Sequence, residues 1–282
     1  MWLTLGTSHY VIDGGLSRIE TALAEAIPNI HLKWATSGII RDPANPLLVS
    51  VQATRDGHTH TIDGFHHVIF ATQANRAVPI LTEYQTQLPE GPTKDIVGRQ
   101  IACLEKFRYI EAIIINHTDD TVLPDCDEDI RDLNLIALPS STPSLKTDPS
   151  ACSPSSCTMA TYILPEGTDR YPLFQTTNPI IPIQPDTILS KVRLERALST
   201  MEGKKAVRSL MVSTPPQWWE SPYQTEKLPG PLQGAQAKEG QPLLWFCGAY
   251  AHEGIPLLEG CVVSAGMVAR EIVEQEGGRV SW

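Results

Sequence analysis

Two stretches of the 282-residue sequence combine residue types and spacings that could do chemistry. In the first, His117 ends a predicted strand over residues 107–117, and Asp119 follows two positions later. An imidazole and a carboxylate two positions apart could orient each other as an acid–base pair, which makes both candidate catalytic residues. The alternative is a histidine at the end of a strand, followed by a local aspartate turn. The spacing alone leaves both interpretations open.

The second stretch, residues 243–273, would present backbone N–H groups to a ligand. The apolar run 243–247 predicts a buried strand, and it leads directly into Gly248. Small and apolar residues then recur at helical spacing from about Gly260 to Val273. The first N–H groups of such a helix have no partner within it and suit an anionic or electron-rich ligand edge. The alternative is an ordinary strand–turn–helix unit without a ligand.

This second stretch resembles the C-terminal flavin motif of the flavin-containing amine oxidase superfamily, and most closely a subgroup of amine-oxidase-like predicted NAD/FAD-binding proteins. The motif is a strand, a glycine, a loop with a second glycine, and "G..SG..A" opening a helix. The matching positions are Gly248, Gly254, Gly260, Ser264, Gly266 and Ala269. The resemblance implies FAD contacts from Gly248, Ala249, Gly254, Ile255, Pro256, Leu257, Leu258 and Gly260. Many members carry an acidic residue where this sequence has Ala249.

The N-terminal part resembles the same superfamily in the order of its elements. After Gly14 and Gly15 the pattern predicts a helix over 18–26, a short strand at 30–34, a three-stranded meander and a buried strand over 66–72 that runs into a helix through Leu81. Within the meander, Arg55-Asp56-Gly57 is a strong hairpin signal between 47–54 and 58–62. The resemblance implies that Thr36, Ser37 and Gly38 hold the adenine end of FAD, and that Ala71 and Thr72 pass beside the dinucleotide.

Together these patterns predict an α/β (mixed α+β) protein with two domains. The first is an incomplete FAD/NAD(P)-binding Rossmann-like domain with a β-meander, formed by 13–82 and 233–282. The second is a substrate-binding domain, formed by 1–12 and 83–232, whose mixed sheet would contain strands at 107–117, 158–164, 173–177 and 188–193.

Composition excludes several classes of function. A net charge of −10 and a pI near 5.3 argue against nucleic acid or an anionic membrane as the main partner. No apolar run approaches the roughly 20 residues of a transmembrane helix, and the N-terminus does not read as a secretory signal, so we expect a cytoplasmic location. His58 and His60 alternate on a predicted exposed edge without other ligands nearby, so no metal site is predicted. Cys152 and Cys157, in a Ser/Pro-rich stretch, could pair or stay free.

No G-x-G-x-x-G occurs in the sequence, although the superfamily binds the FAD pyrophosphate with that motif. The chain is therefore expected to begin after the pyrophosphate site and to need a separate N-terminal FAD-binding segment. We expect an FAD-dependent oxidoreductase of amine-oxidase type, which oxidises an amine or another apolar organic substrate by hydride transfer to the flavin. The alternative is a degenerate or truncated paralogue that acts as a non-catalytic binding or interaction module.

Overall fold

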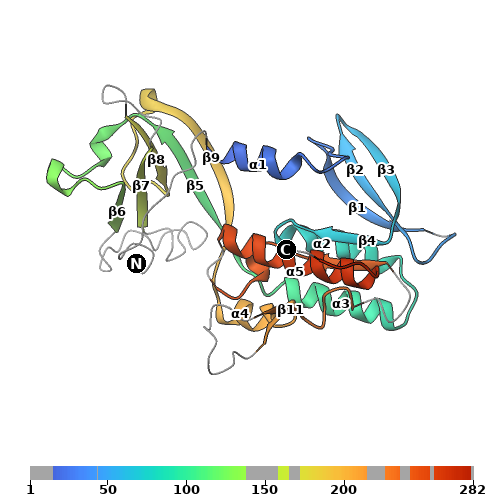
Figure 1. The fold of residues 1–282 in the computed structure, drawn as a ribbon. Coiled ribbons are helices and arrows are strands. Elements are labelled where there is room, and N and C mark those ends of the chain that lie inside the picture. Colours follow the sequence, from blue (N-terminus) through green and yellow to red (C-terminus); the bar gives the residue numbers. More distant parts are fainter. Residues whose placement is uncertain are drawn as a thin grey trace.

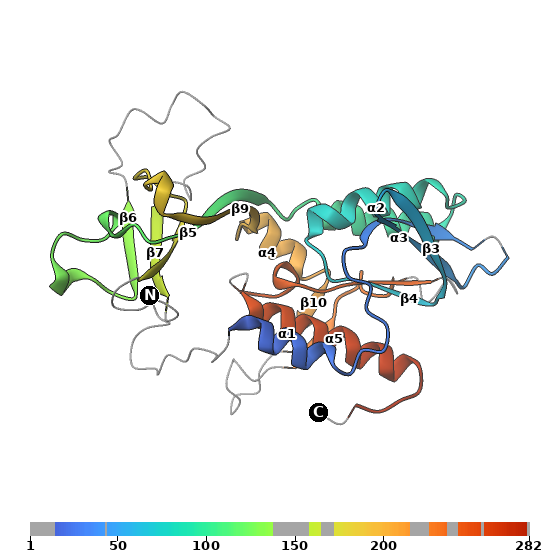
Figure 2. The same cartoon turned by 90° about the horizontal axis from the view of Figure 1, so that it is seen from above.

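The computed structural model describes residues 15–42, 44–137, 158–164, 172–214, 226–235, 242–254 and 257–280. The predicted strand at 1–12, the Ser/Pro-rich stretch with Cys152 and Cys157, and the predicted ligand residues Ile255 and Pro256 lie outside these ranges. The described residues form a mixed α/β fold with several sheets, as the sequence predicted. One of these sheets has five strands. Figures 1 and 2 show this sheet at one end of the molecule and most helices and the smaller sheets toward the other.

The N-terminal segment is a helix followed by an antiparallel meander. It consists of α1 (Leu16–Ala24), β1 (Ala35–Arg41), β2 (Val49–Arg55) and β3 (His58–Phe65). Asp56 and Gly57 form the predicted hairpin turn with φ of 51° and 80°, a pair of left-handed conformations that matches the twist of paired strands. The predicted strand at 30–34 is wrong, because a turn at 32–33 with Lys33 at φ 62° interrupts it.

A short parallel sheet brings two distant segments together. β4 (His67–Phe70) pairs in parallel with β12 (Leu243–Phe246), in the register His67 to Leu243 and Phe70 to Phe246. Both segments are apolar because the pair lies in the main core, where Leu244, Trp245 and Phe246 are fully buried. α2 (Ala74–Thr86) follows β4 after three residues, and α5 (Leu258–Gln275) is the next α-helix after β12. α3 (Pro92–Leu104) packs on α2.

The largest sheet in the described residues has the strand order β6-β7-β8-β5-β9. All its pairs are antiparallel, so the predicted mixed sheet is wrong for these strands. Its members are β5 (Tyr109–His117), β6 (Leu133–Ala137), β7 (Thr158–Leu164), β8 (Leu173–Thr177) and β9 (Ile188–Ala197). A separate small core around Ile115, Val122 and Met159 covers one face. β9 is longer than the predicted strand at 188–193, and it pairs with β5 along the whole of β5. This pair of strands connects the two ends of the molecule in Figure 1.

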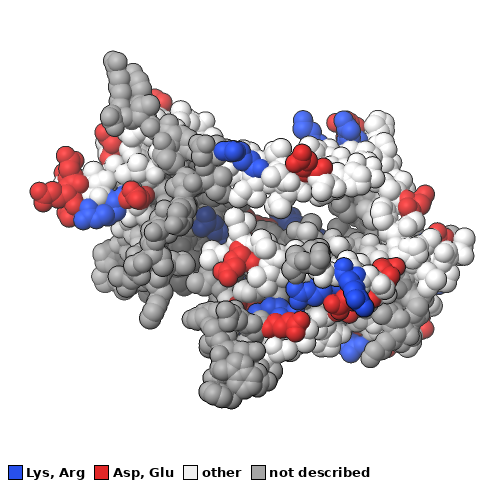
Figure 3. All heavy atoms as spheres, viewed as in Figure 1, with Lys and Arg blue, Asp and Glu red and all other residues white. Residues whose placement is uncertain are grey.

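Short elements complete the described structure. They are η2 (Asp120–Val122), η3 (Asp127–Asp129), η6 (Pro185–Thr187), α4 (Met201–Val207), β10 (Met211–Ser213), β11 (Lys227–Pro229) and η8 (Ala249–Ala251). None of the helices in the described ranges has the length and apolar character needed to cross a bilayer. The acidic side chains of η3 are exposed and form a group at the far left tip of the molecule in Figure 3.

Candidate functional site

A cavity of about 640 Å³ lies where β4 and β12 end, and we call it the strand-end cavity. Because these strands are parallel, the residues that follow them reach the same edge of the sheet. Ala71 and Thr72 after β4 and Gly248 and Ala249 after β12 therefore line one cavity, and Leu257 joins them before α5. Five of the predicted cofactor-binding residues are brought together here. The other lining residues are Gln73, Tyr109, Glu195, Arg196, Ala197, Tyr250 and Cys261.

The glycines and serine of the C-terminal motif fix the turn between β12 and α5. Gly248 has φ 142°, a conformation open essentially to glycine, and a Cβ there would lie 3.2 Å from the Tyr250 ring. The Ser264 hydroxyl accepts the Gly248 N–H at 2.9 Å and reaches the Gly260 carbonyl at 2.7 Å. A Cβ on Gly260 would lie 3.0 Å from His252 and 3.3 Å from the Ala249 carbonyl. The turn therefore packs closely against the first turn of α5.

The opposite wall of the strand-end cavity is tied to the start of α2. The Tyr109 hydroxyl accepts the backbone N–H of Ala74 at 2.8 Å, which leaves its own proton available for donation. The Glu195 carboxylate accepts hydrogen bonds from Asn75 at 3.0 Å and from Arg76 at 2.9 Å. Gln73 donates to the Glu195 carbonyl at 2.7 Å. Burial raises the pKa of Tyr109, with a smaller contribution from Glu195, so the phenol stays protonated at neutral pH.

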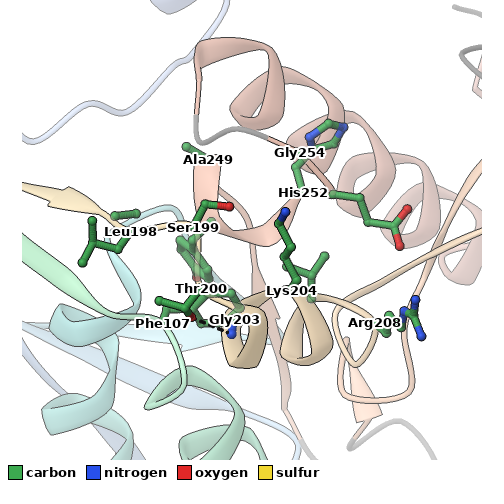
Figure 4. Close-up of a pocket in the computed structure, with 14 residues that line it drawn as sticks. Phe107, Leu198, Ser199, Thr200, Gly203, Lys204, Arg208, Ala249, His252 and Gly254 are labelled. Carbon is green, nitrogen blue, oxygen red and sulfur yellow. Dashed lines mark hydrogen bonds between the residues drawn. The ribbon is translucent and has the colours of Figure 1, made fainter. Parts of the chain in front are cut away.

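A second cavity, of about 300 Å³, is lined by residues of η8 and α4 (Figure 4). It shares Ala197, Ala249 and Tyr250 with the strand-end cavity. Its other walls include Phe107 and, in Figure 4, Lys204, which rises from α4 toward His252. The position of α4 is set at its start, where the Thr200 hydroxyl accepts the Gly203 N–H at 3.0 Å. The predicted ligand residue Gly254 lines this second cavity.

Tyr250 separates the two cavities and is 5% exposed. Its ring packs edge-on against Phe107, with centroids 4.9 Å apart. Its hydroxyl is buried and has no hydrogen-bond partner in the described part of the chain. Burial raises the pKa of Tyr250 well above its usual value, so the hydroxyl is a neutral donor. This is the kind of group that a bound ligand can satisfy.

The remaining predicted cofactor residues lie elsewhere. Thr36, Ser37 and Gly38 are on β1 and do not line the strand-end cavity. Thr36 and Ser37 are exposed, whereas Gly38 is buried. Leu258 and Gly260 belong to the first turn of α5, where Leu258 is exposed and Gly260 makes the close contact with His252.

His117 and Asp119 are close in space, but neither lines the strand-end cavity or the second cavity. Their side chains make contacts within and beside the five-stranded sheet instead. His117 is fully buried; its Nδ1 accepts the Asp119 N–H at 3.2 Å, and its Nε2 lies 2.7 Å from the Thr176 hydroxyl. The Asp119 carboxylate accepts the N–H groups of Thr121 and Gln184 at 3.1 and 2.8 Å. These are the contacts of a strand-end histidine beside an aspartate turn.

The environments of this pair shift both pKa values downward. Burial lowers the pKa of His117, and the charge of Asp119 opposes this only in part. Burial would raise the pKa of Asp119, but the hydrogen bonds from Gln184 and Thr121 outweigh it and lower the pKa. His117 is therefore neutral and Asp119 ionised at neutral pH.

Sequence reasoning missed Tyr109, Glu195, Gln73 and Tyr250 as cavity residues. Tyr109 lies near the start of the predicted strand at 107–117, and Tyr250 follows the motif glycine by two positions, so both stood beside recognised signals. Glu195 lies beyond the predicted end of its strand, although Val192 and Leu194 alternating with charged residues could have extended that strand.

Comparison of the chain with models of protein families and with curated proteins finds no match. In the described ranges, no three His, Cys, Asp or Glu side chains are grouped so that they could hold a metal ion.

Proposed function

We propose that the strand-end cavity holds the isoalloxazine end of FAD, and that the chain is part of an FAD-dependent oxidoreductase of amine-oxidase type. The observation that carries this proposal is that the ends of two parallel strands, β4 and β12, line one cavity together with the residue before α5. Ligands of open α/β sheets bind at the carboxyl ends of the strands. On this proposal the β4–β12 pair and its helices belong to a Rossmann-like domain formed by 13–82 and 233–282.

The residues present fit the ring end of a flavin. Gly248 lacks a side chain, and Ala71 and Ala249 have short ones, so a flat ring can approach the backbone there. The first N–H groups of α5 would stabilise negative charge on a ring edge, although Glu259 in the same turn opposes this. Tyr109 could donate a hydrogen bond from the opposite wall. Bound FAD would supply the chemistry by accepting a hydride from the substrate.

We propose that the second cavity binds the substrate, an amine or another apolar organic molecule, which would reduce the flavin. It shares Ala197, Ala249 and Tyr250 with the strand-end cavity, so a molecule in one lies next to a molecule in the other. Phe107 and Leu198 give it apolar walls. The sequence holds no pyrophosphate motif, so we propose that a separate segment carrying G-x-G-x-x-G completes the FAD site.

The test is a titration with FAD, followed by flavin absorbance and fluorescence. The purified chain is used alone and with a separately expressed G-x-G-x-x-G segment from a member of the superfamily. We expect weak binding alone and saturable binding with the segment. Ala249→Leu, which adds three carbon atoms to the wall of the strand-end cavity, should weaken that binding by at least about tenfold, because the larger side chain would collide with a ring bound against this wall. Ala44→Leu, at an exposed loop position, should leave it unchanged.

An interaction module remains the second candidate because α1 has an exposed apolar face. Leu16 is 50% and Leu23 70% exposed, and Ile19 on the same helix and Ile27 just after it are exposed too. A helix with such a face usually packs against a partner. Absence of FAD binding both with and without the segment would exclude the oxidoreductase and favour the module.

A further inference from the structure

Basic side chains gather around a third cavity, of about 700 Å³, between α3 and α4. Both helices lie below α5 in the view of Figure 1. Four basic residues line this cavity against two acidic ones, Glu105 and Glu202. The basic residues are Arg99, Lys106, Arg108 and Lys205. An excess of positive charge here is notable because the whole chain has 32 acidic and only 22 basic residues.

None of these four basic side chains has an ion-pair partner within 4.0 Å in the described residues. Some basic side chains elsewhere are paired, such as Lys94 with Glu90 at 2.7 Å and Arg193 with Glu111 at 3.1 Å. Glu105 and Glu202 offset only half of this positive charge, so an anion placed among the four cations would reduce their mutual repulsion.

The floor of the third cavity is apolar and uncharged. It is formed by Ala102, Cys103, Ala206, Pro231 and Leu232, of which Cys103, Ala206 and Leu232 are buried. Burial raises the pKa of the Cys103 thiol to about 11, so the sulfur carries no charge that would repel an anion. The Cys103 thiol points to the Ala206 carbonyl at 3.5 Å, which joins α3 to α4 beneath the cavity.

From this arrangement we infer that the third cavity binds a small organic phosphate monoester. A phosphate dianion matches an excess of two positive charges, and arginine binds phosphate through paired N–H donors. Inorganic phosphate would fill only part of the volume, and the apolar floor would cover an organic group beside it. A small ligand is favoured over an acidic protein surface because the cations surround a hollow.

The site differs from the proposed flavin and substrate cavities. α4 turns Gly203 and Lys204 toward the second cavity and Lys205 and Ala206 toward the third. No residue lines both the third cavity and the strand-end cavity. The inference therefore does not depend on FAD binding.

The experiment is isothermal titration of the whole chain with phenyl phosphate, with inorganic phosphate and phenol as matched ligands. We expect saturable binding of phenyl phosphate, weaker binding of phosphate and none of phenol. The variant Arg99→Gln/Lys205→Gln should weaken phenyl phosphate binding by at least about tenfold, because charge-assisted hydrogen bonds are lost. Raising the salt concentration should also weaken it.

The control variant, Lys94→Gln/Arg193→Gln, removes the same charge from two ion-paired positions and should change the affinity less than about twofold. Circular dichroism should show both variants folded. Equal weakening by both variants, equal affinity for phosphate and phenyl phosphate, or no saturable binding of phenyl phosphate at millimolar concentration would each overturn the inference.

Discussion

The hydroxyl of Ser264, on α5, accepts the backbone N–H of Gly248 at 2.9 Å, and this bond joins the end of β12 to the helix that follows it. The serine is fully buried. It also reaches carbonyl oxygens of its own helix, including that of Gly260 at 2.7 Å. One side chain thus fixes the turn that forms a wall of the strand-end cavity.

Replacing this hydroxyl should destabilise the protein. In Ser264→Ala the Gly248 N–H loses its acceptor in a buried place, so the free energy of unfolding should fall by about 1–3 kcal/mol. Urea denaturation measures the change. The matched control is Ser190→Ala, because Ser190 makes one exposed hydrogen bond, to Asn116 at 2.9 Å. That variant should stay within about 0.5 kcal/mol of the original chain.

Two glycines of the same motif should respond to alanine in opposite directions. Gly248→Ala forces an L-residue to φ 142° and places its Cβ 3.2 Å from Tyr250, so we expect a loss of about 1–3 kcal/mol. Gly266 lies inside α5 with nothing within 4 Å of an added Cβ. Gly266→Ala should therefore stabilise the helix by about 0.5–1 kcal/mol. Thermal unfolding that shifts in the same direction for both variants would contradict this account of the motif.

The hydroxyls of Tyr109 and Tyr250 should contribute differently to the free energy of unfolding. Tyr109→Phe removes the acceptor of the Ala74 N–H at the start of α2 and should cost about 0.5–1.5 kcal/mol. The Tyr250 hydroxyl is buried, with no partner in the residues that the structure describes, so Tyr250→Phe should leave stability unchanged or raise it. Melting temperatures of the two variants without ligand test this. A larger loss for Tyr250→Phe would show that its hydroxyl has a partner.

His117 should make stability depend on pH in the mildly acidic range. Because burial lowers its pKa, the unfolded chain binds a proton at a higher pH than the folded chain does. Stability is then full above about pH 6.5, the ordinary pKa of histidine, and falls as the pH decreases toward the folded-state pKa. In His117→Gln the free energy of unfolding should vary less between about pH 5 and 7 than in the original chain.

Asp119 should cause a second decrease in folding stability, at lower pH than the decrease caused by His117. Its pKa is lowered in the folded state, so its contribution is present above the ordinary aspartate value and lost as the pH falls through the folded-state value. His58→Gln, at an exposed position of β3, is the control for the histidine substitution and should keep the original pH profile. A profile of His117→Gln identical to that of His58→Gln would show that His117 does not titrate with unfolding.

Local patterns were enough to predict most of the elements but not their partners. The hairpin at Asp56 and Gly57 was predictable because its turn conformation depends on two neighbouring residues. The strand over 243–247 was predictable from its apolar run, but its parallel pairing with β4 depends on contacts between distant segments. His117 could not be placed from its spacing to Asp119, because Thr176 and Gln184 decide its surroundings. Glu195 contacts Asn75 and Arg76, which lie about 120 positions earlier in the chain. A local sequence pattern therefore cannot predict these contacts.

The β5–β9 pair joins the strand-end cavity to the five-stranded sheet. At one end Tyr109 and Glu195 form a wall of the strand-end cavity, and at the other His117 lies in the core of the distant sheet. β5 has nine residues from Tyr109 to His117, a span of roughly 27 Å at the usual rise of a strand. Tyr109 and Glu195 lie on the two strands of this pair, so the same two strands that enter the distant sheet also place this wall of the strand-end cavity.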